Sequence, residues 1–285
     1  MTSSLDSWIG RKEEARDTAS AFPAAALAAT LDRPETDPKP GDALPPCWHW
    51  LYFLDAVPAG ETGEDGHRRK GGFLPPVDLP RRMWAGSRLD FLAPIRIGDA
   101  LRRESEILSV AEKSGRSGRL VFVTVRHRVT AERTLAVEEE HDIVYRDLPK
   151  PGVPPAASER AVEGPPWRRS LVPDPVMLFR FSALTFNGHR IHYDHPYVTG
   201  VEGYPGLIVH GPLQAILLLD LCRRHAGAPV RRFSFRAQQP AFAGKPLSVN
   251  GAPSKDQASA RLWIADAEGA VAMSGEAAFG SSAPA

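Results

Sequence analysis

Four of the nine histidines of this 285-residue chain fall in one short segment. They are His189, His192, His195 and His210. Histidine titrates near neutral pH and is the side chain that most often acts as a general acid or base. Asn187 stands five residues before His192, and polar side chains at this spacing across a short turn can hold one water molecule between them. The segment therefore predicts a site that activates water.

The residue after His210 supplies a second kind of chemistry. Gly211 opens an apolar stretch over residues 212–225, with Pro212 in its first turn and basic residues at its end, a pattern typical of a buried helix. A backbone N–H at the start of a helix stabilises a polarised carbonyl oxygen. Water activation beside such a group suits the addition of water to a conjugated carbonyl compound, or its removal.

Other interpretations of these residues exist. The spacing of three between His189, His192 and His195 also fits a metal site, but neither Glu nor Cys stands at ligand spacing, so no metal is expected. His210 is as well explained by a structural hydrogen bond near the helix start as by catalysis. Asp194 either orients a histidine ring or is an ordinary solvated residue.

The composition excludes several classes of partner. Lys+Arg number 35 and Asp+Glu 34, so the net charge of +1 gives no broad field for nucleic acid or an anionic membrane. With only two cysteines, a disulfide framework or a cysteine-based zinc site is not expected. The polar N-terminus carries no secretory signal pattern, and the longest apolar run (215–219) is too short to span a bilayer. We expect a cytoplasmic globular protein.

The length, about twice that of a typical domain, points to two halves. Prolines are frequent, and those between residues 148 and 166 favour an extended connector. The boundaries we predict are an N-terminal unit over 1–150, a linker over 151–166 and a C-terminal unit over 167–285. A Pro-x3-Gly-x2-Leu pattern recurs 146 residues apart, at Pro94 and Pro240, which suggests duplication.

Each half ends in strand-like segments. Residues 120–125 and 135–145 in the first half, and 261–265 and 270–279 in the second, are rich in β-branched or aromatic side chains. Strands on both sides of the buried helix indicate an α+β fold, with an antiparallel sheet wrapped around the helix.

The segment SALTFNGHRIHYD (182–194), together with Ile-Val-His-Gly at 208–211, resembles the MaoC-like enoyl-CoA hydratases and 3-hydroxyacyl-thioester dehydratases. Within this family, the segment 182–194 is most similar to that of the branch of mesaconyl-C4-CoA (3-methylfumaryl-CoA) hydratases, itaconyl-CoA hydratase-like proteins and mitochondrial type 2 dehydratases. The resemblance implies a double hotdog fold, two antiparallel sheets each wrapped around a central helix. It also implies that His192 acts on water while the Gly211 N–H binds the thioester carbonyl.

One position departs from the family motif, because Asn187 stands where the family has a catalytic Asp. An amide does not take up a proton at physiological pH, so His192 is left as base and acid while Asn187 orients the water. His189 stands where the commoner motif has Asn and could share proton transfer. The resemblance implies no cofactor, since the CoA thioester is the substrate, and it implies a homodimer or higher homo-oligomer.

The family branch favours hydration of a C4 or C5 dicarboxylyl-CoA, such as mesaconyl-C4-CoA or itaconyl-CoA, to citramalyl-CoA. Arg190, inside the motif, is the preferred partner of the free carboxylate. The first half lacks the motif and is expected to be a non-catalytic hotdog that shapes the acyl-CoA pocket. The alternatives are a dehydratase of fatty acid metabolism, a hotdog thioesterase and a non-catalytic acyl-CoA-binding protein.

Overall fold

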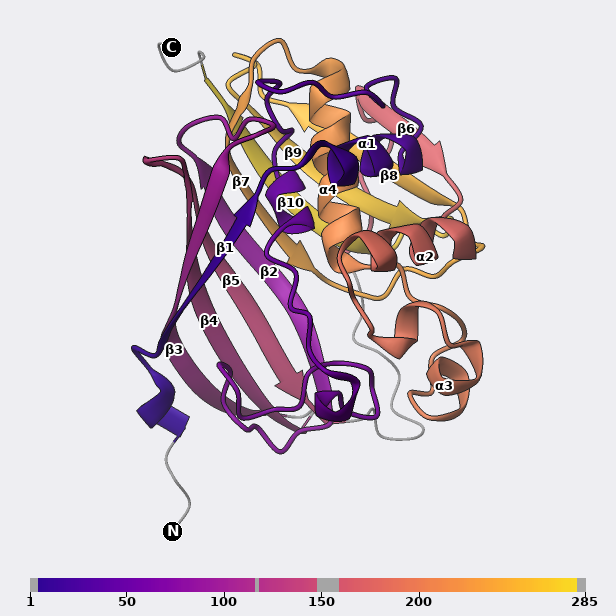
Figure 1. Ribbon diagram of the computed structural model, residues 1–285. Helices are drawn as coiled ribbons and strands as arrows, with labels where there is room; N and C mark the ends of the chain where they lie inside the picture. Colours follow the sequence, from indigo (N-terminus) through magenta and orange to yellow (C-terminus); the bar gives the residue numbers. More distant parts are fainter. Residues whose placement is uncertain (1–4, 116–117, 148–158, 281–285) are drawn as a thin grey trace.

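The computed structural model describes residues 5–115, 118–147 and 159–280 (Figure 1). Its main feature is one antiparallel sheet of ten strands, in the order β1-β3-β4-β5-β2-β7-β10-β9-β8-β6. The strands of the first half are β1 (Lys12–Thr18), β2 (Arg81–Phe91), β3 (Ala100–Gly115), β4 (Gly118–Ala131) and β5 (Thr134–Arg146). Those of the second half are β6 (Trp167–Leu171), β7 (Val230–Ala237), β8 (Leu247–Pro253), β9 (Ser259–Asp266) and β10 (Val271–Phe279).

The strand order repeats itself about the centre of the sheet. Read outward from the centre, β2, β5, β4, β3 and β1 correspond to β7, β10, β9, β8 and β6. The two halves join where residues 86–90 of β2 pair with residues 232–236 of β7. The predicted segments 120–125, 135–145 and 261–265 all lie inside strands, as does 270–279 except for its first residue. Of the predicted linker, residues 151–158 lie outside the described part of the chain.

The helices lie mainly in the second half. They are α1 (Ala21–Thr30), α2 (Pro175–Leu184), α3 (His195–Gly200) and α4 (Gly211–His225). The helix predicted over 212–225 is confirmed as α4, and every residue from Leu213 to Cys222 is buried. α4 contacts all five strands of the second half, so that this part of the sheet curves around it (Figure 1). Burial on every side explains why the helix is apolar all round.

The first half differs from the expected hotdog in one respect. Between Thr30 and Arg81, all of which the structure describes, the only helical pieces are the 3-10 turns Trp48–Leu51 and Ala59–Glu61. The first of these turns ends at Tyr52, whose backbone is extended, and Phe53 after it has a left-handed φ of 59°, so the chain does not continue as a helix. In this double hotdog the sheets of the two halves join into one continuous sheet, and α4 is the long helix that the second half wraps.

A buried carboxylate fixes α4 to its surroundings. Asp220 is 2% exposed and forms ion pairs with Arg169 of β6 at 2.9 Å and Arg224 of α4 at 2.8 Å. Arg33, in the loop after α1, lies 3.4 Å from the same carboxylate. These contacts join three segments of the chain around the helix that carries Gly211 at its start. No helix among the described residues is long and apolar enough to cross a membrane.

Candidate active site

His192 is buried at the end of the 3-10 turn Arg190–His192 and has a fixed ring orientation. Its Nδ1 lies 2.7 Å from the carbonyl oxygen of Ile208, which can only accept a hydrogen bond. Nδ1 therefore carries the proton and Nε2 keeps its lone pair. Burial lowers the pKa of His192 to about 4, so the ring is neutral at neutral pH. These are the properties of a general base.

His210 packs against one face of the His192 ring. The two rings stack with centroids 3.6 Å apart and an interplanar angle of 20°. His210 is fully buried, its Nε2 lies 2.8 Å from the hydroxyl of Ser182 in α2, and burial holds its pKa well below the usual value. This environment favours the structural role for His210, as a flat support that fixes the plane of the His192 ring.

Asn187 uses one end of its amide to shape the loop. Its Oδ1 accepts a hydrogen bond from the backbone N–H of His189 at 3.0 Å, which closes a local turn. The preceding residue, Phe186, has a left-handed φ of 46° and turns the chain out of α2. With Oδ1 used in this way, Nδ2 remains to donate toward the oxygen of a water molecule.

Gly211 is the first residue of α4 and has open space beside it. A Cβ built on Gly211 would meet no atom within 4 Å. Ile208 N donates to Ile191 O at 3.0 Å, and Ile208 O accepts from His192. The segment that leads into α4 is thus bonded to the loop that carries the base, which fixes Gly211 relative to His192.

Arg190 is already paired within the protein. Its guanidinium forms an ion pair with Asp194 at 2.8 Å, donates to Glu64 O at 3.0 Å and lies 4.0 Å from the centre of the Tyr197 ring. Asp194 also caps α3 by accepting from the Tyr197 N–H, so it does not orient a histidine. These contacts make Arg190 an anchor of the loop, and its role as partner of a substrate carboxylate stays a prediction. The rings of His189, His192 and His210 contact one another in sequence and form a histidine cluster. His195 is exposed and lies outside this cluster.

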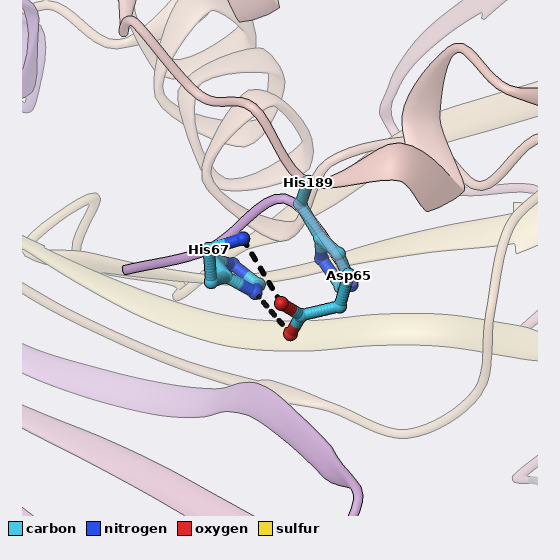
Figure 2. A group of neighbouring side chains, drawn as sticks. All are labelled: Asp65, His67 and His189. Carbon is cyan, nitrogen blue, oxygen red and sulfur yellow. Dashed lines mark hydrogen bonds and ion pairs between the residues drawn. The ribbon is translucent and has the colours of Figure 1, made fainter. Parts of the chain in front are cut away.

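The first half adds two residues that the sequence reasoning did not find. Asp65 and His67 lie against His189 (Figure 2), and the His67 and His189 ring centroids are 3.9 Å apart. The Arg190 N–H donates to the Asp65 carbonyl oxygen at 2.9 Å, which joins the two loops. The only signal in the sequence is a single histidine in the charged, glycine-rich segment 61–72, which by itself indicates a loop.

A hollow of about 510 Å³ lies away from these residues. Strands β7, β9 and β10 line it, together with residues 159–162, and none of the histidines described above borders it. The hollow is therefore separate from the histidines of the motif.

Comparison with known proteins agrees with this geometry. The family model for hydroxyacyl-thioester dehydratase type 2 matches residues 47–243. The chain belongs to this family. The matched range contains both the 187–211 motif and the loop of the first half that carries Asp65 and His67. The family makes the protein an enzyme of the hydratase/dehydratase class.

Two curated relatives are similar to this chain over most of its length. The mesaconyl-C(4)-CoA hydratase of Chloroflexus aurantiacus is 48% identical over 277 residues, which covers 96% of this chain and 97% of that protein. The mitochondrial hydroxyacyl-thioester dehydratase type 2 of Schizosaccharomyces pombe is 27% identical over 233 residues, 73% of this chain and 77% of that protein.

Among the structures, HtdX of Mycobacterium tuberculosis matches with a TM-score of 0.64 at 18% identity, covering 94% of this chain and all of that one. A MaoC-like dehydratase matches with a TM-score of 0.67 at 14% identity, over 98% of this chain and 100% of that one. A further M. tuberculosis protein, with a double hotdog fold, has a TM-score of 0.61 at 15% identity, over 95% and 96% of the two chains. At these identities the likeness is one of fold, and it confirms the predicted double hotdog.

Proposed function

We propose that this enzyme catalyses the reversible hydration of mesaconyl-C4-CoA or a closely similar C4 or C5 dicarboxylyl-CoA, with citramalyl-CoA as the hydrated product. The observation that carries the proposal is the bond from His192 Nδ1 to Ile208 O, which leaves Nε2 available as a base. The 48% identity to a mesaconyl-C(4)-CoA hydratase over nearly the whole chain supports the substrate.

In the hydration direction, Asn187 Nδ2 donates to the oxygen of the attacking water. The water gives one proton to His192 Nε2, and its oxygen bonds to the β-carbon of the enoyl group. The electron pair of the double bond moves through the α-carbon to the thioester oxygen. The Gly211 N–H at the positive end of α4 stabilises the enolate that forms.

The enolate then takes up a proton at the α-carbon, and the protonated His192 can supply it. In this minimal scheme one histidine carries out both transfers, and no cofactor or metal takes part. Burial and the neighbouring histidines lower the pKa of His189 and keep its ring neutral.

The free carboxylate of the substrate needs a cation near the reacting carbons. Since Arg190 is paired with Asp194, the stronger candidate is Arg82 of β2, which lines a small cavity together with His189. No carboxylate among the described residues forms an ion pair with Arg82, whereas the neighbouring Arg81 is paired with Glu202 at 2.9 Å. An unpaired guanidinium can take a substrate carboxylate in a bidentate bond.

A panel of thioesters tests the proposal. We expect the purified enzyme to hydrate mesaconyl-C4-CoA or itaconyl-CoA with a kcat/KM at least about tenfold above that for crotonyl-CoA, because only the dicarboxylyl substrates reach an arginine. The measurement is loss of enoyl-thioester absorbance with identification of the product by mass. Equal or better use of crotonyl-CoA and longer acyl chains would support a fatty-acid dehydratase instead. Release of free thiol would reveal a thioesterase, and binding without turnover a non-catalytic protein.

The proposal also includes a cytoplasmic homodimer. Large apolar side chains are exposed on and beside α2, among them Val176, Phe179 and Phe186, and a partner subunit would cover them. Light scattering coupled to size-exclusion chromatography gives the mass directly, and a monomer would contradict this part of the proposal.

A further inference from the structure

Asp65 and His67 form a carboxylate–histidine pair within the first half. The Asp65 Oδ2 lies 2.9 Å from His67 Nδ1, and its Oδ1 accepts from the His67 backbone N–H at 3.0 Å. The hydrogen bonds from His67 hold the pKa of Asp65 below its ordinary value despite its partial burial, so the carboxylate is ionised and only accepts. His67 Nδ1 therefore carries a proton in both forms of the ring, and Nε2 is the atom that gains or loses the second proton.

The pair stands at the end of a row of histidines. The His67 ring lies 3.9 Å from His189, whose ring lies edge-on to His192 at 5.5 Å, and His192 in turn stacks on His210. A cavity of about 20 Å³ borders Asp65 and His189, which is room for one water molecule. The second half contributes three members of this row, and the first half contributes His67.

His67 differs from the rest of the row in its partner. Burial lowers the pKa of all four histidines, but the bond to Asp65 opposes this effect at His67. His192 has a neutral carbonyl oxygen as its partner, and His210 a hydroxyl. A proton shared by the row is therefore held best on His67.

The surrounding charges favour a proton over a metal ion. Asp65, His67 and His189 each offer one ligand atom, and these three atoms lie within 4.8 Å of one another. This is close enough for a metal ion. The Arg82 guanidinium, however, acts on both histidines, and the Lys70 ammonium acts on Asp65. Two cations beside a single carboxylate oppose a divalent ion, and the same cations attract an anionic intermediate to this end of the row.

We propose that His67 is a second acid–base residue of the active site, contributed by the first half, and that Asp65 is its positioning residue. This rests on the proposed hydration and divides its two proton transfers between two histidines. Together His67 and Asp65 supply the second proton-transferring group that Asn187, as an amide, cannot be.

Hydration begins with His192 neutral and His67 protonated on both ring nitrogens. Water breaks one O–H bond to His192 Nε2 as its oxygen bonds to the β-carbon, and the electron pair of the double bond moves to the thioester oxygen. The enolate then forms its α-C–H bond with the proton of His67 Nε2, which leaves His67 neutral. The proton on His192 returns to His67 through exchangeable water, and the enzyme is restored. In dehydration, neutral His67 removes the α-proton while Asp65 stabilises the resulting imidazolium.

His67→Gln tests the proposal, because glutamine can still donate to Asp65 but cannot carry a proton. We expect kcat for hydration to fall about 100-fold with KM changed by less than about threefold. We also expect the alkaline limb of the kcat/KM profile, which the pKa of His67 sets below the ordinary value of 6.5, to disappear. Asp65→Asn should lower kcat less, by about tenfold, and Asp65→Glu should restore part of it. His195→Gln, an exposed histidine of the same region, is the control and should behave as wild type.

A His67→Gln variant with the wild-type kcat and pH profile would overturn the proposal, and so would a loss confined to KM. A second measurement does not depend on turnover: NMR titration of the ring protons in the wild type should show His67 protonating at the highest pH of the four. Asp65→Asn should lower that pH, and the opposite order contradicts the proposal even if a variant fails to fold. If the wild-type enzyme hydrates no acyl-CoA, the proposed function fails, whereas turnover that survives His67→Gln removes only this inference.

Discussion

Gly66 of the first half packs directly against the backbone of Gly188 in the second. A Cβ on Gly66 would lie 1.9 Å from the Gly188 carbonyl oxygen, and one on Gly188 would lie 2.8 Å from the Gly66 carbonyl oxygen. No side chain fits between two segments this close. The contact lies between Asp65 and His67 on one loop and between Asn187 and His189 on the other, so the two halves meet beside the histidines.

Gly66→Ala should separate the two loops. The methyl group clashes with backbone, and the φ of +85° at this position strains any L residue by roughly 1–2 kcal/mol. We expect kcat to fall at least about tenfold, since small displacements of positioned groups reduce rates strongly. The control is Gly72→Ala, where the new Cβ makes only an ordinary contact with the Arg68 side chain at 3.6 Å. Equal activity of the two variants would show that the close contact between Gly66 and Gly188 is not needed for the reaction.

Asn187→Ala and Asn187→Asp separate the two uses of this amide. Alanine removes both the bond to His189 N and the donor to water, and we expect a fall in kcat of about 100-fold. Aspartate can still accept from His189 N and should therefore retain more activity than alanine. Steady-state kinetics with the same substrate measure both. An alanine variant that is as active as aspartate would remove Asn187 from the site.

The parts of the site that a short segment encodes could be predicted from the sequence. The spacing between Asn187 and His192 and the apolar run after Gly211 each lie within a few turns of backbone, where local patterns are informative. The buried helix is found where its proline, leucines and basic end place it. The orientation of the His192 ring could not be predicted, because it depends on Ile208 O, sixteen residues away along the chain.

Contacts between segments that are far apart in the chain leave no pattern in the sequence that would predict them. Asp65 and His67 approach His189 across more than 120 residues of chain, and their own segment reads as an ordinary polar loop. The pairing of Arg190 with Asp194 was equally hidden, since an i,i+4 spacing indicates an ion pair only if the backbone between them turns like a helix. The short helical turn of the first half could not be predicted either, because it ends where the backbone of Tyr52 and Phe53 leaves the helical region.

On acidification, the free energy of unfolding should begin to fall at a pH well above the pKa values of ordinary carboxylates. Burial lowers the pKa of His127 to about 3 and those of His141 and His192 to about 4, against an ordinary value of 6.5. Between pH 6.5 and 4 the unfolded chain therefore binds protons that the folded chain does not. The free energy of unfolding, measured by urea titration, should be highest above about pH 6.5 and decrease steadily toward pH 4.

Glu139 extends the same trend to lower pH. Its burial alone would raise its pKa, but the contact with His49 and the nearby His127 and His141 lower it to about 2. Its contribution is present above the ordinary value of 4.5 and is lost below it, so it adds to the histidine effect in sign. A free energy of unfolding that stays constant from pH 7 to 4 would contradict the buried, neutral state of these histidines.

Asp220→Ala should destabilise the fold strongly. Removing this carboxylate leaves the Arg169 and Arg224 guanidinium groups without their shared partner, and breaking a buried pair in this way costs about 3–5 kcal/mol. Glu140→Ala breaks the half-exposed pair with Arg88 and should cost less than about 1 kcal/mol. Thermal and urea unfolding measure both. A similar small loss for the two variants would mean that Asp220 does not hold α4 in place.

The most direct test of the account is the hydration of mesaconyl-C4-CoA by the wild-type enzyme and by His192→Gln, followed by absorbance and by mass analysis of the product. We predict that the wild type forms citramalyl-CoA and that the variant, with an unchanged circular dichroism spectrum, loses at least about 1,000-fold in kcat. A folded His192→Gln variant that hydrates the substrate at the wild-type rate would contradict the assignment of His192 as the base.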